Sequence, residues 1–136
     1  MTHATGQREF RRFLAAGEGE RVEFKRCSKG VRDDTFETVC SFLNGGGGDV
    51  FLGVEDGGTV CGVARDSVEK IVADVVRTAS NPALFSPPVQ LCPEVFNIGA
   101  KTLIRIRVPA SAATHSYKGG VYRRIDDADF LEPLTV

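Results

Sequence analysis

A short apolar run after four consecutive glycines constrains the fold of this chain more than any other feature. Gly45 to Gly48 end a helical pattern, and residues 49–54 then read Asp-Val-Phe-Leu-Gly-Val. A short, nearly continuous apolar run of this kind is typical of a central strand that is covered on both faces. The sequence therefore predicts a sheet with packed layers around it rather than a helical bundle.

The glycine run has two interpretations. A phosphate-binding loop lies between a strand and the N-terminus of a helix, whereas this run lies between a helix and a strand. No Gly-Lys-Ser/Thr sequence follows it either. The favoured interpretation is that the glycines end a helix in a left-handed conformation and allow another backbone to approach closely.

Three amphipathic helices are predicted by apolar residues at intervals of three and four. They cover residues 7–16, a segment that begins near Asp33 or Asp34, and a segment that begins at Asp66. In the second helix, Asp34 and Glu37 have the spacing of a capping box. Its expected buried stripe consists of Phe36, Val39, Cys40 and Leu43.

Polar and apolar residues alternate in the segments predicted to be strands. Besides 49–54, these are the segments 21–25, 59–63, 89–96, 101–108 and 121–125, of which 59–63 is the expected hairpin partner of 49–54. In 101–108, Arg105 and Arg107 are expected on the face opposite the apolar residues. We predict the α/β (α+β) class, with a single mixed, mostly antiparallel sheet and two or three helices.

The length and composition fit one domain. The chain has 136 residues, of which 42% are hydrophobic and 26% charged, and this is ordinary for a globular protein. We therefore expect a single domain over 1–136. No apolar run approaches the length of a membrane span, and no signal-peptide pattern is present, so a cytoplasmic location is expected. The four cysteines contain no Cys-x-x-Cys pair, which argues against a structural zinc site.

Acidic residues gather around the two predicted strands 21–25 and 49–54. Glu18, Glu20 and Glu23 precede or lie in the first strand, and Asp49, Glu55 and Asp56 flank the second. If the strands are neighbours, carboxylates from each can converge and hold Mg²⁺ or Mn²⁺. The alternative is that these acids are solvated at strand ends and turns.

Basic residues are concentrated although the net charge is only −1. Residues 97–124 contain six Lys and Arg side chains and no acid. Such a block predicts a basic surface that captures phosphate, and Tyr122 beside Arg124 would add a ring for stacking. The alternative is that the strands carry ordinary solvated cations on their outer faces.

The order of several motifs resembles the Schlafen-type AlbA-like domain over about residues 17–125. The motifs are Glu18-x-x-x-x-Glu23-Phe24-Lys25, Phe42-Leu43-Asn44-Gly45-Gly46, Gly53-Val54-Glu55-Asp56-Gly57 and Tyr122-Arg123-Arg124. The resemblance implies a nucleic-acid-binding α/β domain, which in bacterial regulators is often joined to a winged-helix or helicase-like partner. In the vertebrate Schlafen branch the domain cleaves tRNA and rRNA, and the three acids of that nuclease match Glu18, Glu23 and Asp56.

Two functions follow as hypotheses. The first is a nucleic-acid-binding module, expected to be the N-terminal part of a bacterial-type transcriptional regulator, that contacts phosphates of DNA or RNA. Its expected contact residues are Lys25, Arg105, Arg107, Lys118, Tyr122 and Arg124. The alternative is an endoribonuclease that cleaves structured RNA such as tRNA with Mg²⁺ or Mn²⁺ at Glu18, Glu23 and Asp56. A homodimer that buries the basic strands is a further alternative, and no membrane partner is expected.

Overall fold

A four-stranded mixed sheet lies at the centre of the molecule. The computed structural model describes residues 2–133, and its central sheet has the strand order β1-β2-β5-β4. β1 (Val22–Lys25) pairs in parallel with β2 (Gly48–Leu52), and the other pairings are antiparallel. β5 (Lys101–Val108) is the longest strand and β4 (Glu94–Ile98) forms the far edge.

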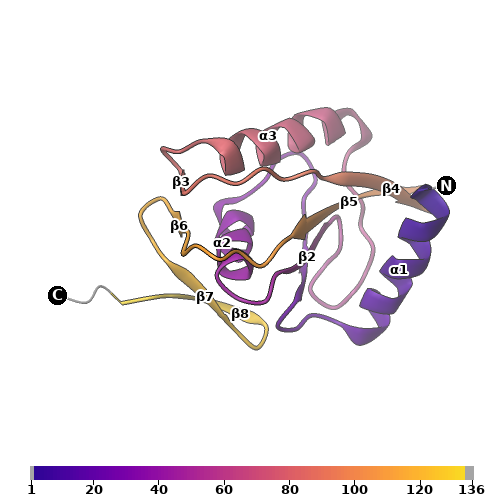
Figure 1. The fold of residues 1–136 in the computed structure, drawn as a ribbon. Helices are drawn as coiled ribbons and strands as arrows, with labels where there is room; N and C mark the ends of the chain where they lie inside the picture. The colour runs from indigo at the N-terminus through magenta and orange to yellow at the C-terminus, as the bar shows by residue number, and fades with distance from the viewer. Residues whose placement is uncertain (1, 134–136) are drawn as a thin grey trace.

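Helices cover both faces of this sheet (Figure 1). α1 (Thr2–Ala16) packs Phe10 against Phe51 and Leu103 on one face. α2 (Asp33–Leu43) and α3 (Val68–Ser80, preceded by the 3₁₀ turn Arg65–Ser67) pack on the opposite face, against Ile104 and Ile106. Adjacent residues of one strand point to opposite faces, so both cores draw on β2 and β5.

Two short ribbons complete the fold. β3 (Phe85–Ser86) pairs with β6 (Ser116–Tyr117), and β7 (Tyr122–Ile125) pairs with β8 (Ala128–Leu131). The β7–β8 ribbon lies against α2, at the lower left of Figure 1. Among residues 2–133, no helix is long and apolar enough to cross a membrane.

The glycine run closes α2 and lets it turn directly into the sheet. Gly47 has a φ of 77°, and a Cβ atom there would lie 2.7 Å from the carbonyl oxygen of Val108. A Cβ on Gly48 would meet the Phe42 ring at 2.7 Å. Close backbone approach therefore explains these glycines, as expected.

The predicted fold class is confirmed, with three helices and mixed, mostly antiparallel sheets. The buried stripe of α2 is also confirmed, because Phe36, Val39, Cys40 and Leu43 are all buried. α1 begins five residues earlier than the predicted residue 7, at Thr2.

Several local predictions were wrong. The strands form a four-stranded sheet and two separate ribbons rather than one sheet, and the strand predicted over 89–96 lies at Glu94–Ile98. Residues 59–63 form only the single bridge Val54–Val60, because the amides of Cys61 and Gly62 both donate to the Gly53 carbonyl and bend the chain away. The capping box is absent, since no side chain caps α2 and Asp34 instead accepts from Lys25. β8 was not predicted. The turn that leads into it contains Asp126 in a left-handed conformation (φ 55°).

Candidate functional site

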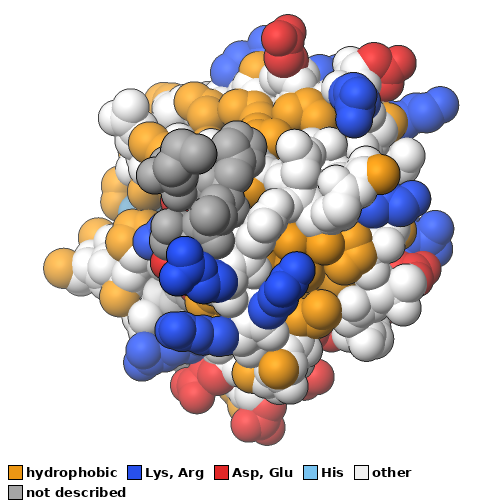
Figure 2. Space-filling view, turned by 90° about the vertical axis from the view of Figure 1, so that its right-hand side faces the viewer, with side chains coloured by type: hydrophobic (Ala, Val, Ile, Leu, Met, Phe, Trp, Pro, Cys, Tyr) orange, Lys and Arg blue, Asp and Glu red, His pale blue; other side chains and the backbone are white. Residues whose placement is uncertain are grey.

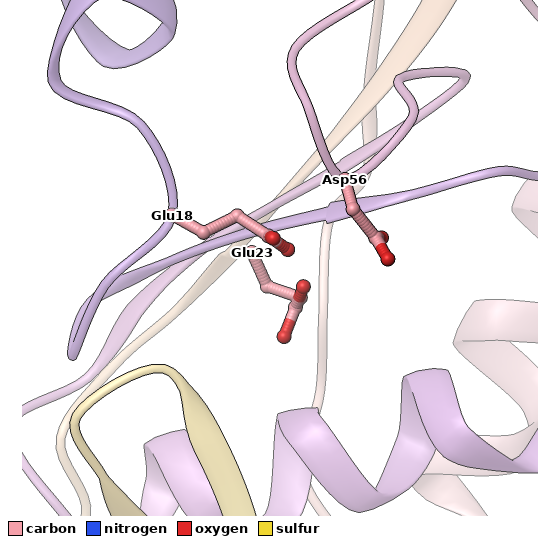
Figure 3. A group of neighbouring side chains, drawn as sticks. All are labelled: Glu18, Glu23 and Asp56. Carbon is pink, nitrogen blue, oxygen red and sulfur yellow. The ribbon is translucent and has the colours of Figure 1, made fainter.

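Three carboxylates from different segments converge at the β1 edge of the central sheet (Figure 3). Glu18 lies in the turn after α1, Glu23 on β1, and Asp56 in the loop after β2. One carboxylate oxygen from each residue lies within 4.8 Å of those from the other two. The parallel pairing of β1 with β2 is what brings these segments together. Glu20, Asp49 and Glu55 from the same acidic group of the sequence are not in this cluster.

Short-range backbone contacts hold Glu18 beside Glu23. α1 ends at Ala16, and the next residue, Gly17, turns the chain back toward the sheet with a φ of 79°. The Gly19 amide donates to the Val22 carbonyl at 3.0 Å, which closes a tight turn between the two acids. The Glu18 carboxylate then accepts the backbone N–H of Phe24 at 3.1 Å. This geometry points the two carboxylates toward one another.

The carboxylates are only partly solvated. Glu23 is buried, Glu18 is half-buried and Asp56 is exposed. Burial raises the pKa of Glu18 above its usual value, and the charge of Asp56 raises it further, against the opposing effect of the Phe24 hydrogen bond. Like charges this close are unfavourable without a cation. Three hard oxygen donors in this arrangement fit Mg²⁺ or Mn²⁺.

Arg124 lies beneath this cluster rather than on the surface. Its side chain is only 2% exposed, and it donates to Glu23 at 3.0 Å and to Asp129 at 2.8 Å. A guanidinium that is buried between two carboxylates has no free face for a phosphate. The prediction that Arg124 contacts nucleic acid was therefore wrong, because the β7–β8 ribbon turns the Arg124 side chain inward.

Arg105 is also buried, at 6% side-chain exposure. It pairs with Asp49 at 2.8 Å and with Glu9, and its guanidinium lies 5.1 Å from the centre of the Phe13 ring. The sequence placed Arg105 on the open face of its strand, but α1 covers that face. The prediction that Arg105 contacts phosphate was wrong for this reason.

The remaining expected contact residues lie at separate places. Arg107 and Lys118 are about half exposed, yet Arg107 pairs with Glu94 at 2.8 Å and Lys118 with Asp33 at 2.9 Å. Lys25 pairs with Asp34 at 3.4 Å. All five expected cations therefore have a carboxylate partner among the described residues.

Tyr122, the expected stacking residue, lies against the protein. Partial burial and the neighbouring Glu37 carboxylate raise its pKa. Its ring is packed against the core cluster that includes residues of α2. Tyr122 therefore does not present its ring between exposed guanidinium groups, as the stacking prediction required.

Other exposed arginines form no ion pair with a carboxylate of residues 2–133. They are Arg8, Arg11 and Arg12 on α1, Arg21 before β1, and Arg32 and Arg65 elsewhere on the surface. Figure 2 shows Lys and Arg side chains on the face of the molecule that carries α1. Phe10, Phe13 and Leu14 lie on one side of the predicted helix 7–16 and leave the arginines mostly on the other, so this surface was detectable in the sequence.

A cleft of about 450 Å³ adjoins this surface. Arg21 and Arg107 line it, together with the glycines at the start of β2. The guanidinium of Arg21 lies so close to Gly46 that a Cβ atom there would be 2.7 Å from its Nη2 atom. Arg21 is thus held beside the cleft by packing against the glycine backbone.

The chain belongs to the family described as Schlafen, AlbA_2, which matches residues 18–130. A search of the curated proteins finds no match. Among solved structures, the chain is similar to the N-terminal domain of a RecG-related protein from Nitrosomonas europaea, which is named for an ATP-dependent DNA helicase. The two are 29% identical, each is 90% covered, and the TM-score is 0.59.

A second solved structure shares the fold. It is the DIP2311 protein from Corynebacterium diphtheriae, with 17% identity and a TM-score of 0.66 over 93% of this chain. The match spans 30% of the DIP2311 chain. The family match includes all three residues of the carboxylate cluster.

Proposed function

We propose that this domain binds nucleic acid through its phosphate backbone and holds a divalent cation at Glu18, Glu23 and Asp56. The observation that carries the proposal is the convergence of these three carboxylates within 4.8 Å. The similarity to the N-terminal domain of the RecG-related protein supports a nucleic-acid ligand. It also supports a place for this domain at the N-terminus of a larger protein, which we propose is a transcriptional regulator.

The chain's own residues have distinct tasks in this proposal. Glu23 is fixed on β1, Glu18 is fixed by the Phe24 amide, and Asp56 lies in an exposed loop that admits the ligand. A bound Mg²⁺ or Mn²⁺ would supply charge neutralisation and Lewis-acid activation at a phosphate group. Lys25 lies close enough for its positive charge to lower the pKa of Glu18, and in this proposal its ammonium group exchanges Asp34 for the same phosphate.

The α1 arginines supply exposed positive charge for the rest of the nucleic-acid strand. Arg8, Arg11 and Arg12 lie on the helix that ends directly before Glu18. A nucleic-acid backbone that runs along α1 would therefore lead to the carboxylate cluster. Phosphate contacts of this kind provide affinity with little sequence selectivity. Arg107 and Lys118 remain proposed contacts, because their exposed side chains can exchange an acidic partner for a phosphate.

Cleavage of structured RNA is a second candidate function. It is favoured by the three-carboxylate geometry. Binding of nucleic acid does not require three converging carboxylates, whereas metal-assisted hydrolysis of a phosphodiester uses such a donor set. The domain would then act as a divalent-metal-dependent endoribonuclease, with Glu18, Glu23 and Asp56 as catalytic residues.

Binding is tested by titrating a generic duplex DNA and a tRNA at increasing salt concentration. We expect affinity to fall steeply with salt, and we expect Arg11→Gln to lower the slope by about one if one phosphate contact is lost. Lys70→Gln is the matched control, since Lys70 is an exposed cation on α3, across the sheet from α1. Salt-independent binding, or equal effects of the two substitutions, would contradict the proposed surface.

Cleavage is tested by incubating tRNA with Mn²⁺ or Mg²⁺. We expect Asp56→Asn to abolish cleavage while the protein still binds the RNA. Glu20→Gln should retain full activity, because Glu20 lies between Glu18 and Glu23 in sequence but outside the cluster. Binding without cleavage in either metal would leave only the binding function.

A further inference from the structure

We propose that Arg124, held in place by Asp129, is the positioning residue of the carboxylate site. It orients Glu23 and the turn that carries Glu18, and the C-terminal β7–β8 ribbon thereby sets the cation affinity of a site at the opposite end of the sequence. This inference rests on the proposed function, since it concerns the same three carboxylates.

Arg124 contacts both ends of the turn between the two glutamates. Its Nη1 atom donates to the Glu23 carboxylate at 3.0 Å. Its Nη2 atom donates to the carbonyl of Gly19 at 2.8 Å and to that of Val22 at 3.3 Å. One guanidinium thus joins a carboxylate of the site to both ends of the Gly19–Val22 turn, whose first residue follows Glu18. Five N–H donors in a rigid plane make this possible for arginine and not for lysine.

Asp129 fixes the guanidinium from the other side. It accepts from Arg124 at 2.8 Å and from the Ser41 hydroxyl at 2.6 Å, and the Thr38 hydroxyl also donates to it. Ser41 and Thr38 lie on α2, so this carboxylate is anchored to a buried helix. The Phe42 ring lies 4.9 Å from the guanidinium carbon and restricts it further. The position of Arg124 is therefore set by α2 and β8 together.

The charges identify positioning, rather than neutralisation, as the role of Arg124. Asp129 contributes a negative charge that offsets part of the positive charge of the guanidinium, which still lowers the pKa of Glu18. Negative charge on Glu18, Glu23 and Asp56 consequently remains uncompensated without a bound cation. Arg124 uses one oxygen of Glu23, and the second oxygen stays available as a metal ligand. Groups that orient metal ligands in this way commonly change metal affinity by about 10- to 100-fold when they are replaced.

The decisive variant is Arg124→Lys, which keeps the charge and removes the planar fork. We expect its Mn²⁺ affinity, measured by electron paramagnetic resonance titration, to fall by at least about tenfold. Arg123→Lys is the matched control, because Arg123 is the adjacent residue and instead pairs with Glu132. Unchanged Mn²⁺ affinity in folded Arg124→Lys would overturn the inference.

Two other variants separate charge from geometry. If Arg124 only repelled the cation, Arg124→Met would bind Mn²⁺ more tightly than the parent, and that result would also overturn the inference. Asp129→Asn serves if neither Arg124 variant folds, as judged by circular dichroism. It should bind Mn²⁺ more weakly because Arg124 loses its anchor, and parent-like affinity would contradict the proposal.

A metal-free measurement distinguishes failure of this inference from failure of the proposed function. If the parent binds no Mn²⁺, the proposed cation site is wrong, but the positioning role is still tested by hydrogen exchange. The Phe24 amide, which donates to Glu18, should exchange faster in Arg124→Lys than in the parent, relative to amides of β5. Equal exchange rates would show that Arg124 does not position Glu18.

Discussion

The carboxylate cluster and the acid-free segment 97–124 both concentrate one sign of charge, yet folding treats them in opposite ways. Glu18, Glu23 and Asp56 converge, and Arg124, the cation paired with one of them, is shared with Asp129. In segment 97–124, by contrast, Arg105, Arg107 and Lys118 each meet acids from distant parts of the chain. A run of like charge in sequence therefore predicts surface potential only when its partners are also known.

The largest expected effect is on the free energy of unfolding, when two arginines on the same face of β5 are replaced in turn. Arg105→Met should lower the free energy of unfolding by about 3–5 kcal/mol, because it leaves Asp49 and Glu9 without the buried guanidinium between them. Arg107→Met should lower it by less than about 1 kcal/mol, since Arg107 is 54% exposed. Urea unfolding measures both, and equal losses would show that α1 does not seal this face.

An intermediate effect tests the carboxylate cluster by linkage. Mn²⁺ at a hundredfold excess over its dissociation constant should raise the free energy of unfolding by about 2.7 kcal/mol. Asp56→Asn should lose this rise, and Glu20→Gln should keep it. The same stabilisation in all three proteins would place the bound ion elsewhere.

The smallest expected effect concerns Glu18 in metal-free protein. Burial raises the folded-state pKa of Glu18, so the folded state holds this proton more tightly than the unfolded state does. The ionised carboxylate therefore destabilises the fold above that pKa, and the penalty disappears as pH falls below the ordinary value of 4.5. Glu18→Gln should stabilise the protein at pH 7 by up to about 1 kcal/mol, a typical size for partly solvated charges.

Urea unfolding at pH 7 and pH 4 in the presence of a chelator measures this difference. The advantage of Glu18→Gln should be present at pH 7 and should shrink at pH 4. A less stable variant at pH 7 would indicate that the hydrogen bond from Phe24 outweighs burial and the charge of Asp56.

Local patterns predicted most of the helices and strands because their causes are local. The spacing of Phe36, Val39, Cys40 and Leu43 allows one buried face, and all four residues are buried. Alternation in β5 likewise separates Ile104 and Ile106 from Arg105 and Arg107. Which of these two faces would meet solvent could not be predicted, because an amphipathic α1 can pack against either side of the sheet.

In the candidate site, too, some features were predicted from the sequence and others were missed. Glu18, Glu23 and Asp56 were identified from spacing and family resemblance, and the neighbouring positions of β1 and β2 bring them together. The inward position of Arg124 was missed, since it depends on β8, on Asp129 and on the hydroxyl groups of α2. The Ser41–Asp129 and Glu23–Arg124 contacts join residues 88 and 101 positions apart, and no periodicity links them.

By itself, the amino-acid sequence determined the α/β class, the apolar faces and the family, because short-range periodicity and motif order encode them. Only the tertiary structure decided which charges remain available to a ligand. Electrostatic pairing depends on distances of a few ångströms between segments that are far apart along the chain. The same folding that brings three carboxylates together also buries two of the arginines that the sequence had presented as a basic surface.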